Sequence, residues 1–166
     1  VANKDDLLDG IVDIVAGEIE VPEIGGDWRS AMRARALSAH RVLMRHPWAT
    51  MLIVSRPNVG PNMLRYVDAT IGCLVTAGFD YAMADHVWNA VDSFVYGFTL
   101  QKLNFPFDPD EYAEVAKAYL PQIPKTQYPH LYGMSESIIA GDHDGLHELQ
   151  RGLDLLLAGF AGVLDG

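Results

Sequence analysis

The sequence has a single cysteine, Cys73, in 166 residues and therefore cannot form a disulfide within the chain. A chain without internal disulfides fits a reducing compartment, and we expect it to act in the cytoplasm. Because Cys73 lies between Ile71 and Leu74, we expect its thiol to be buried and unreactive.

Basic residues are scarce, with 12 lysines and arginines against 22 acidic residues and a net charge of −10. Nucleic-acid binding needs clustered basic side chains that contact phosphates, so this composition argues against direct contact with DNA or RNA. Seven arginines do gather in one part of the chain. We interpret them mainly as a solvent-facing helix surface, with anion contact as the alternative. They are Arg29, Arg33, Arg35, Arg41, Arg45, Arg56 and Arg65.

Long uninterrupted apolar runs are also missing. The most apolar segment, near the C-terminus, contains Arg151 and Asp154 and is too short to span a membrane. No secretory signal follows Val1. We therefore expect no membrane partner. Since the sequence opens at Val1 and not at a methionine, we also expect a further segment upstream.

Common catalytic motifs are absent as well. We find no nucleophile elbow, no phosphate-binding loop and no histidine pair with a nearby glutamate of the zinc-protease kind. The histidines lack the spacing of a base and a nucleophile. The sequence therefore predicts that the protein is not an enzyme.

The sequence does contain apolar residues at the three- and four-residue spacing of helices, separated by proline and glycine, and no alternation typical of strands. We predict an all-α fold of about eight helices. A proline-containing segment, residues 121–129, is predicted to be a functional or mobile loop. The helices that can be placed cover residues 3–20, 27–46, 47–56, 62–77, 82–103, 110–120 and 144–165.

Two of these helices, residues 82–103 and 144–165, are apolar on nearly every side. Such a helix must be covered all round, which favours a second subunit over burial within one chain. Each glycine in the last helix costs about 1 kcal/mol relative to alanine, a cost that a closely packed neighbouring helix explains. The predicted dimer interface comprises Val91, Phe94, Val95, Phe98, Leu149, Gly152, Leu153, Leu156, Gly159, Phe160 and Val163.

Several short motifs in order, VANKDDLLD at residues 1–9, SRP at 55–57, AGF at 77–79 and GLDLLLAGF at 152–160, resemble the tetracycline-repressor (TetR) family of transcriptional regulators. The likeness spans almost the whole chain. It implies a TetR-like C-terminal domain that dimerises as a four-helix bundle, built roughly from residues 85–102 and 145–165 of each subunit.

The resemblance also implies how the chain is organised. The helix-turn-helix that binds operator DNA is expected upstream of Val1 and outside this sequence. Residues 1–20 then form the helix that links the DNA-binding head to the core, and residues 21–166 form the effector-binding and dimerisation domain.

The mechanism that the resemblance implies is ligand sensing by a repressor. A small molecule enters the core and shifts the helix at residues 62–77, the helix at residues 3–20 transmits the movement, and the operator is released. Such a device needs only a ligand that binds one of two conformations more tightly. The alternative is a dimerisation module whose cavity is filled by its own side chains and which a protein partner regulates.

By position within the family, the expected pocket is mostly apolar with a few polar anchors. Leu52 stands where drug-sensing members place a metal-coordinating histidine, so we expect neither a metal nor a cofactor. Arg35 and Ala39 replace an amide and an aromatic side chain, which indicates a rebuilt pocket. The predicted ligand-binding residues are Arg35, Ser38, Ala39, Leu52, Ser55, Met63, Val67, Thr70, Ile71, Asp85, Trp88 and Asp92.

Two aspartates, Asp85 and Asp92, lie two turns apart on an otherwise apolar helix. Buried carboxylates need partners, so we expect one of them to pair with Arg35 or with a ligand donor. The alternative is that both face solvent. His143 and His147 are spaced for a surface metal site, although two imidazoles are too few for a dedicated one.

Overall fold

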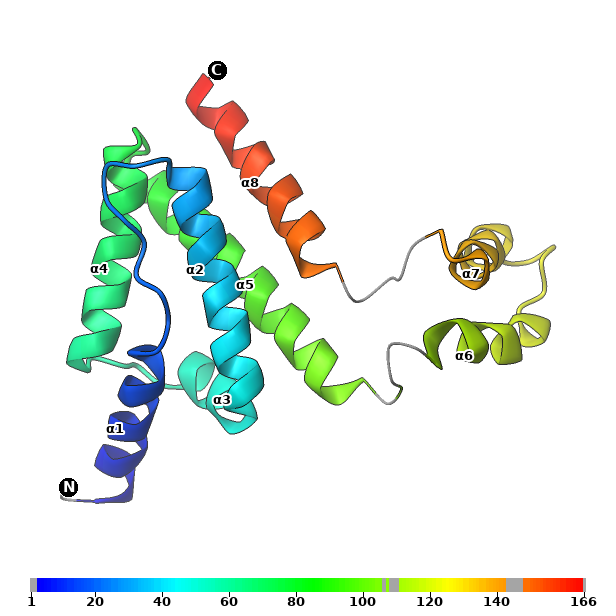
Figure 1. The fold of residues 1–166 in the computed structure, drawn as a ribbon, viewed down its shortest axis with the longest axis horizontal. Coiled ribbons are helices and arrows are strands. Elements are labelled where there is room, and N and C mark those ends of the chain that lie inside the picture. Colours follow the sequence, from blue (N-terminus) through cyan, green and yellow to red (C-terminus); the bar gives the residue numbers. More distant parts are fainter. Residues whose placement is uncertain (1–2, 106, 108–110, 143–147, 166) are drawn as a thin grey trace. The chain divides into compact units, whose positions relative to one another are not determined.

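The computed structural model describes residues 3–105, 107, 111–142 and 148–165, and all its regular structure is helical (Figure 1). No strand occurs within these ranges, which confirms the predicted all-α fold and the number of helices. The elements are α1 (Lys4–Ala16), α2 (Trp28–Arg45), α3 (Pro47–Ser55), α4 (Pro61–Thr76), α5 (Tyr81–Asn104), α6 (Tyr112–Tyr119), the 3-10 turn η2 (Leu120–Gln122), α7 (Pro129–Ala140) and α8 (Leu149–Asp165).

Local signals set the helix ends in the first half of the chain. The side chain of Asn3 accepts a hydrogen bond from the Asp6 backbone N–H at 2.9 Å and caps α1, and Asp27 caps α2 in the same way. After α4, Gly78 adopts a φ of +113°, a conformation that glycine reaches without strain. One predicted end was wrong, because α1 stops at Ala16 and does not continue to residue 20.

The second half differs more from the prediction. The predicted loop at residues 121–129 ends in a helix that the sequence analysis did not place, because Pro129 opens α7 as its first helical residue. Helix α6 begins at Tyr112, and Asp110 lies outside the described residues. The predicted start of the last helix, residues 144–147, also lies outside them, as do His143 and His147.

The helices form two compact units. The first contains α1 to α4, α5 as far as Leu103, and α8 from Gln150 onward. Its core is built from apolar side chains of six helices, α1 to α5 and α8, and burying each large one stabilises the fold by about 1.5–3 kcal/mol. The fully buried members include Val12, Met32, Leu43, Leu74, Val87, Val91, Val95 and Leu153.

The second unit, residues 104–149, holds α6, η2 and α7. Helices α6 and α7 pack against each other. The ammonium group of Lys125 lies 4.7 Å from the centre of the Tyr132 ring, a cation–π contact. The division into residues 1–20 and 21–166 that the sequence analysis proposed stays a prediction.

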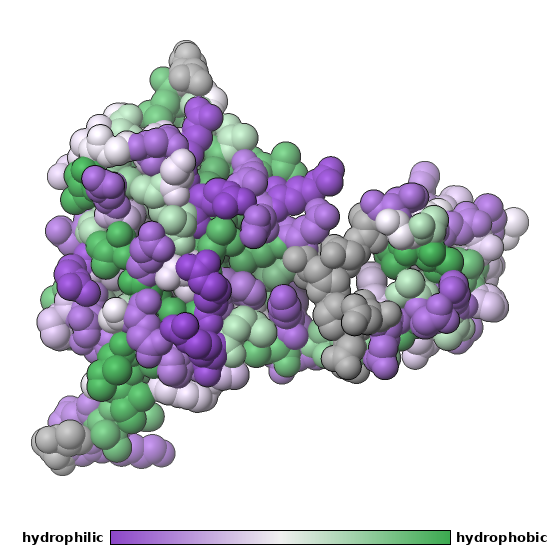
Figure 2. All heavy atoms as spheres, viewed as in Figure 1, coloured by the Kyte–Doolittle hydropathy of each residue, from purple (hydrophilic) through white to green (hydrophobic). Residues whose placement is uncertain are grey.

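Within the first unit, α8 packs on α5 and α2. Arg33 of α2 donates to the Asp154 carboxylate at 2.7 Å. A Cβ added to Gly152 would lie 2.5 Å from Cζ of Phe94, so the Phe94 ring of α5 lies against the α8 backbone at this glycine. Leu155 of α8 is 69% exposed, and Figure 2 shows apolar atoms near the C-terminal end of this helix.

Four residues of the predicted dimer interface, Val91, Val95, Leu149 and Leu153, are buried within the single chain. Helical periodicity could not assign them to the core, because α5 and α8 are apolar on more than one side. As dimer contacts, all eleven residues stay predictions. The residues that retain exposed surface are Phe94, Phe98, Gly152, Leu156, Gly159, Phe160 and Val163.

Throughout the described ranges, no helix combines the length and the apolar character that crossing a membrane requires.

Candidate functional site

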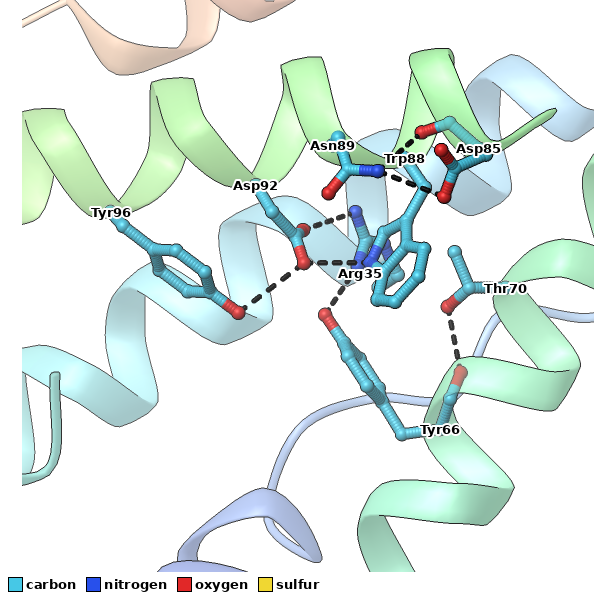
Figure 3. Close-up of polar contacts among 8 residues, drawn as sticks. All are labelled: Arg35, Tyr66, Thr70, Asp85, Trp88, Asn89, Asp92 and Tyr96. Carbon is cyan, nitrogen blue, oxygen red and sulfur yellow. Dashed lines mark hydrogen bonds and ion pairs between the residues drawn. The ribbon is translucent and has the colours of Figure 1, made fainter. Parts of the chain in front are cut away.

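Three side chains of α5 form a row at four-residue spacing, Trp88, Asp92 and Tyr96 (Figure 3). The indole N–H of Trp88 donates to Oδ2 of Asp92 at 2.7 Å, and the hydroxyl of Tyr96 donates to the same oxygen at 3.3 Å. The polar edges of both rings are thus directed at the carboxylate. This arrangement leaves mainly the apolar ring surfaces for contact with other groups.

Behind this row lies Arg35 of α2, whose side chain is 0% exposed. Its Nη2 donates to Oδ1 of Asp92 at 2.7 Å, and its Nη1 donates to the hydroxyl of Tyr66 on α4. The guanidinium carbon also lies 5.2 Å from the centre of the Tyr66 ring. The hypothesis that an aspartate of this helix pairs with Arg35 is confirmed for Asp92. The interpretation of the arginine segment as a solvent-facing surface was wrong for Arg35.

Arg35, Tyr66 and Tyr96 keep their protons over the physiological pH range. Burial acts to lower the pKa of Arg35, but Tyr66 and Asp92 outweigh it and raise that pKa above the ordinary value. Burial raises the pKa of Tyr66, and burial together with the charge of Asp92 raises the pKa of Tyr96. Arg35 therefore remains a cation and both phenols remain neutral.

A pocket of about 420 Å³ opens beside this cluster, within the first unit. Its volume lies in the range of small-molecule sites. Helices α3, α4 and α5 and the α3–α4 connection contribute to its wall. The lining residues are Ile53, Val54, Arg56, Asn58, Met63, Tyr66, Val67, Trp88, Asn89, Asp92, Ser93 and Tyr96.

Four of the twelve predicted ligand-binding residues line this pocket: Met63, Val67, Trp88 and Asp92. Two more lie behind the wall. Arg35 bonds to Asp92 and Tyr66, and Thr70 donates from its hydroxyl to the Tyr66 carbonyl at 2.7 Å.

The other six predicted residues lie elsewhere. Ser38 accepts from the Glu20 backbone N–H, Ala39 is buried in the core, and Asp85 is exposed and receives the Asn89 amide at 2.9 Å. The remaining three, Leu52, Ser55 and Ile71, do not line the pocket. As ligand contacts, all twelve stay predictions.

Sequence reasoning missed eight lining residues. Tyr96 could have been found, because it stands one turn beyond Asp92 on the same helix face. Tyr66 could have been proposed as a partner for a buried arginine, but nothing local marks it. The full set of missed residues is Ile53, Val54, Arg56, Asn58, Tyr66, Asn89, Ser93 and Tyr96.

The α3–α4 connection brings two further polar groups to the pocket wall. Arg56 donates to Asp9 at 2.9 Å and to Asp5 at 3.1 Å, both on α1, and these hydrogen bonds raise its pKa. Asn58 accepts the Gly60 backbone N–H at 3.1 Å through Oδ1. Its buried Nδ2 has no partner among the described residues.

Among the residues that the structure describes, no three His, Cys, Asp or Glu side chains gather as a metal site would require. Leu52 cannot coordinate a metal ion, since its side chain carries no donor atom.

Fold and pocket together define an all-helical domain with a small-molecule-sized pocket backed by a buried ion pair. Residues 21–164 match the family model described as the tetracyclin repressor-like C-terminal domain. The chain therefore belongs to the TetR family of transcriptional regulators.

Known proteins with related sequences or structures agree with this assignment. The chain is 33% identical to an HTH-type transcriptional regulator of Saccharopolyspora erythraea over 97% of its own length and 67% of the relative's. It is 27% identical to the HTH-type transcriptional repressor DrrR1 of Streptomyces coeruleorubidus, covering 95% and 64%. The chain thus spans about two thirds of the length of these relatives.

Among solved structures, the TetR family protein ActR of Streptomyces coelicolor in complex with actinorhodin matches with a TM-score of 0.80 and 27% identity, over 100% of this chain and 79% of ActR. TetR-family regulators act as dimers and bind small-molecule ligands and operator DNA. The relatives are transcriptional regulators and not enzymes.

Proposed function

We propose that this chain is the ligand-sensing and dimerisation core of a TetR-like repressor that acts in the cytoplasm. A small molecule in the pocket between α3, α4 and α5 relieves operator binding, which a DNA-binding head outside this chain performs. The observation that carries this proposal is the pocket of about 420 Å³ backed by the Arg35–Asp92 pair.

The chemistry of the wall indicates the class of ligand. Trp88, Tyr66 and Tyr96 all line the pocket, and the hydrogen bonds to Asp92 hold the rings of Trp88 and Tyr96 in fixed orientations. Aromatic rings prefer to contact other aromatic surfaces by offset stacking or edge to face. We therefore propose a planar aromatic ligand, and ActR in complex with actinorhodin supports the choice of a first probe.

The alternative from the sequence, a dimerisation module whose cavity its own side chains fill, is less well supported. Its cavity would be closed, whereas the side chains of this chain leave the pocket open. We propose dimerisation through the exposed side of α8, where Gly159 and Val163 are exposed, together with the neighbouring part of α5.

Isothermal titration calorimetry of actinorhodin binding to the chain tests the sensor proposal. We expect one site per chain, and we expect Trp88→Ala to weaken binding at least about tenfold, since a buried aromatic contact contributes more than 1.4 kcal/mol. Trp48 lies outside the pocket and is 47% exposed, so Trp48→Ala is the matched control. Equal losses in both variants would reject this pocket as the site. A mobility-shift assay with the full-length regulator then measures operator release.

A further inference from the structure

Three aspartates of α1 stand at four-residue spacing, Asp5, Asp9 and Asp13, and therefore lie on one face of the helix. That face is directed at residues 56–63, which comprise the α3–α4 connection and the first turn of α4 and which we term the connecting segment. Each of the three carboxylates accepts hydrogen bonds from this segment.

Asp13 makes the most buried of these contacts, with 7% of its surface exposed. Its Oδ1 accepts the Met63 backbone N–H at 2.9 Å, and its Oδ2 accepts the Asn62 side-chain amide at 3.1 Å. The first backbone N–H groups of a helix have no partners within that helix. Asp13, on a different helix, accepts two of them in α4, the backbone N–H groups of Asn62 and Met63, and its negative charge suits the N-terminal end of α4.

The close fit depends on the residue that caps α4. Gly60 occupies the N-cap position, and a Cβ there would lie 2.2 Å from Oδ1 of Asp13. The absence of a side chain at Gly60 thus lets α1 approach the first turn of α4. The second link, from Arg56 to Asp9 and Asp5, lies nearer the N-terminal end of α1.

The connecting segment is also a wall of the pocket, through Arg56, Asn58 and Met63. The groups that hold α1 therefore belong to the residues that a ligand meets. The segment also carries Nδ2 of Asn58, which has no partner among the described residues, and an unmade buried hydrogen bond costs free energy that a rearrangement can recover.

We propose that Asp13, assisted by the Arg56 ion pairs, is the positioning residue that couples the state of the pocket to α1. It sets the N-terminal turn of α4, and hence Met63 and Val67, from outside the pocket. A ligand that displaces the connecting segment changes the strength of its contacts with α1. Because such coupling is reciprocal, a change in those contacts changes ligand affinity. This inference rests on the proposed sensing function and names its regulation.

Amide hydrogen exchange, read by mass spectrometry with and without actinorhodin, tests the coupling. The proteins are the unmodified chain, Asp13→Asn and Asp68→Asn; Asp68 is exposed on α4 and provides the same change of charge. In the unmodified chain and in Asp68→Asn, we expect the probe to change exchange in α1 about fivefold or more. In Asp13→Asn the change should remain in residues 56–67 and disappear from α1.

An equal response of α1 in all three proteins would overturn the proposal. If actinorhodin does not change hydrogen exchange in residues 56–67, the proposal that this chain binds such a ligand is rejected. The coupling between the pocket and α1 is then tested without a ligand. Val67→Trp places an indole in the pocket. It should change α1 exchange about fivefold or more, and Val67→Trp combined with Asp13→Asn should not. An unchanged α1 in Val67→Trp, or the same change in both, refutes the coupling.

Asp13→Asn also removes a helix cap and can prevent folding. In that event Arg56→Gln, which breaks only the partly exposed link, takes its place in the same comparison. It should weaken the α1 response to the probe or to Val67→Trp. A full response in Arg56→Gln would count against the assisting role that we assign to the ion pairs.

Discussion

Replacing Asp92 by alanine should be among the most destabilising single changes in the first unit. Arg35 is fully buried, and the carboxylate of Asp92 is its ion-pair partner at 2.7 Å. Without Asp92 the guanidinium cannot escape by losing its proton, because arginine stays protonated in proteins. An uncompensated buried charge therefore remains.

Breaking a buried ion pair from one side costs about 3–5 kcal/mol. The free energy of unfolding of a protein is typically about 5–15 kcal/mol. For a protein near the middle of that range, the loss amounts to roughly a third or more of it. We add nothing for Trp88 and Tyr96, since both border the pocket and can find water as an acceptor. Replacing both partners, Arg35→Met with Asp92→Leu, should restore stability to within about 1 kcal/mol, since no charge is then left unpaired.

Urea unfolding at a fixed protein concentration measures these differences, because dimer formation makes apparent stability depend on concentration. Asp85→Ala is the matched control on the same helix, since Asp85 is exposed, and it should change stability by less than about 0.5 kcal/mol. A similar small effect of Asp92→Ala and Asp85→Ala would refute the reasoning. So would a double variant no more stable than Asp92→Ala alone.

Gly60→Ala should lower the free energy of unfolding by about 1–3 kcal/mol, because its Cβ would overlap Asp13, whereas Gly10→Ala should raise it by about 0.5–1 kcal/mol, since nothing lies within 4 Å there. Urea unfolding gives both values, and the same sign for both would contradict the steric argument. Burial, with two nearby cations, lowers the pKa of His40 below 6.5. The unfolded chain then binds the proton more readily, so stability falls as the pH drops below 6.5; Tm between pH 7.5 and 5.5 should decline less in His40→Gln, and equal declines would disprove this. Gly159→Leu should raise the Tm of the single chain slightly, for the reason given for Gly10, but weaken the dimer about tenfold in sedimentation, and an unchanged dimer would exclude close packing at this glycine.

Local rules made the helix boundaries of the first half predictable. The cap residues Asn3 and Asp27 and the glycine at position 78 act on groups within a few residues of themselves, so their effect can be read without knowing the fold. The partner of Asp92 was predictable for a different reason. A carboxylate on an apolar helix needs a cation, and the chain offers few.

Other features depend on contacts between distant parts of the chain. Nothing near Tyr66 or Asn58 marks either as part of a pocket, since each reaches it only after α3, α4 and α5 have packed. Helix α7 was missed because the prolines of residues 121–129 were interpreted as a loop, whereas the last of them, Pro129, is the first residue of the helix.

The sequence by itself therefore determined the all-helical class, most helix limits, the family and the need for a buried partner of Asp92. Only the tertiary structure decided that Asp92, and not Asp85, is the aspartate that pairs with Arg35, and that Val91, Val95 and Leu153 belong to the core. The physical reason is that periodicity ranks the sides of a helix by polarity, and α5 and α8 are apolar on several sides. Which side faces the core is then settled by the shapes of the other helices.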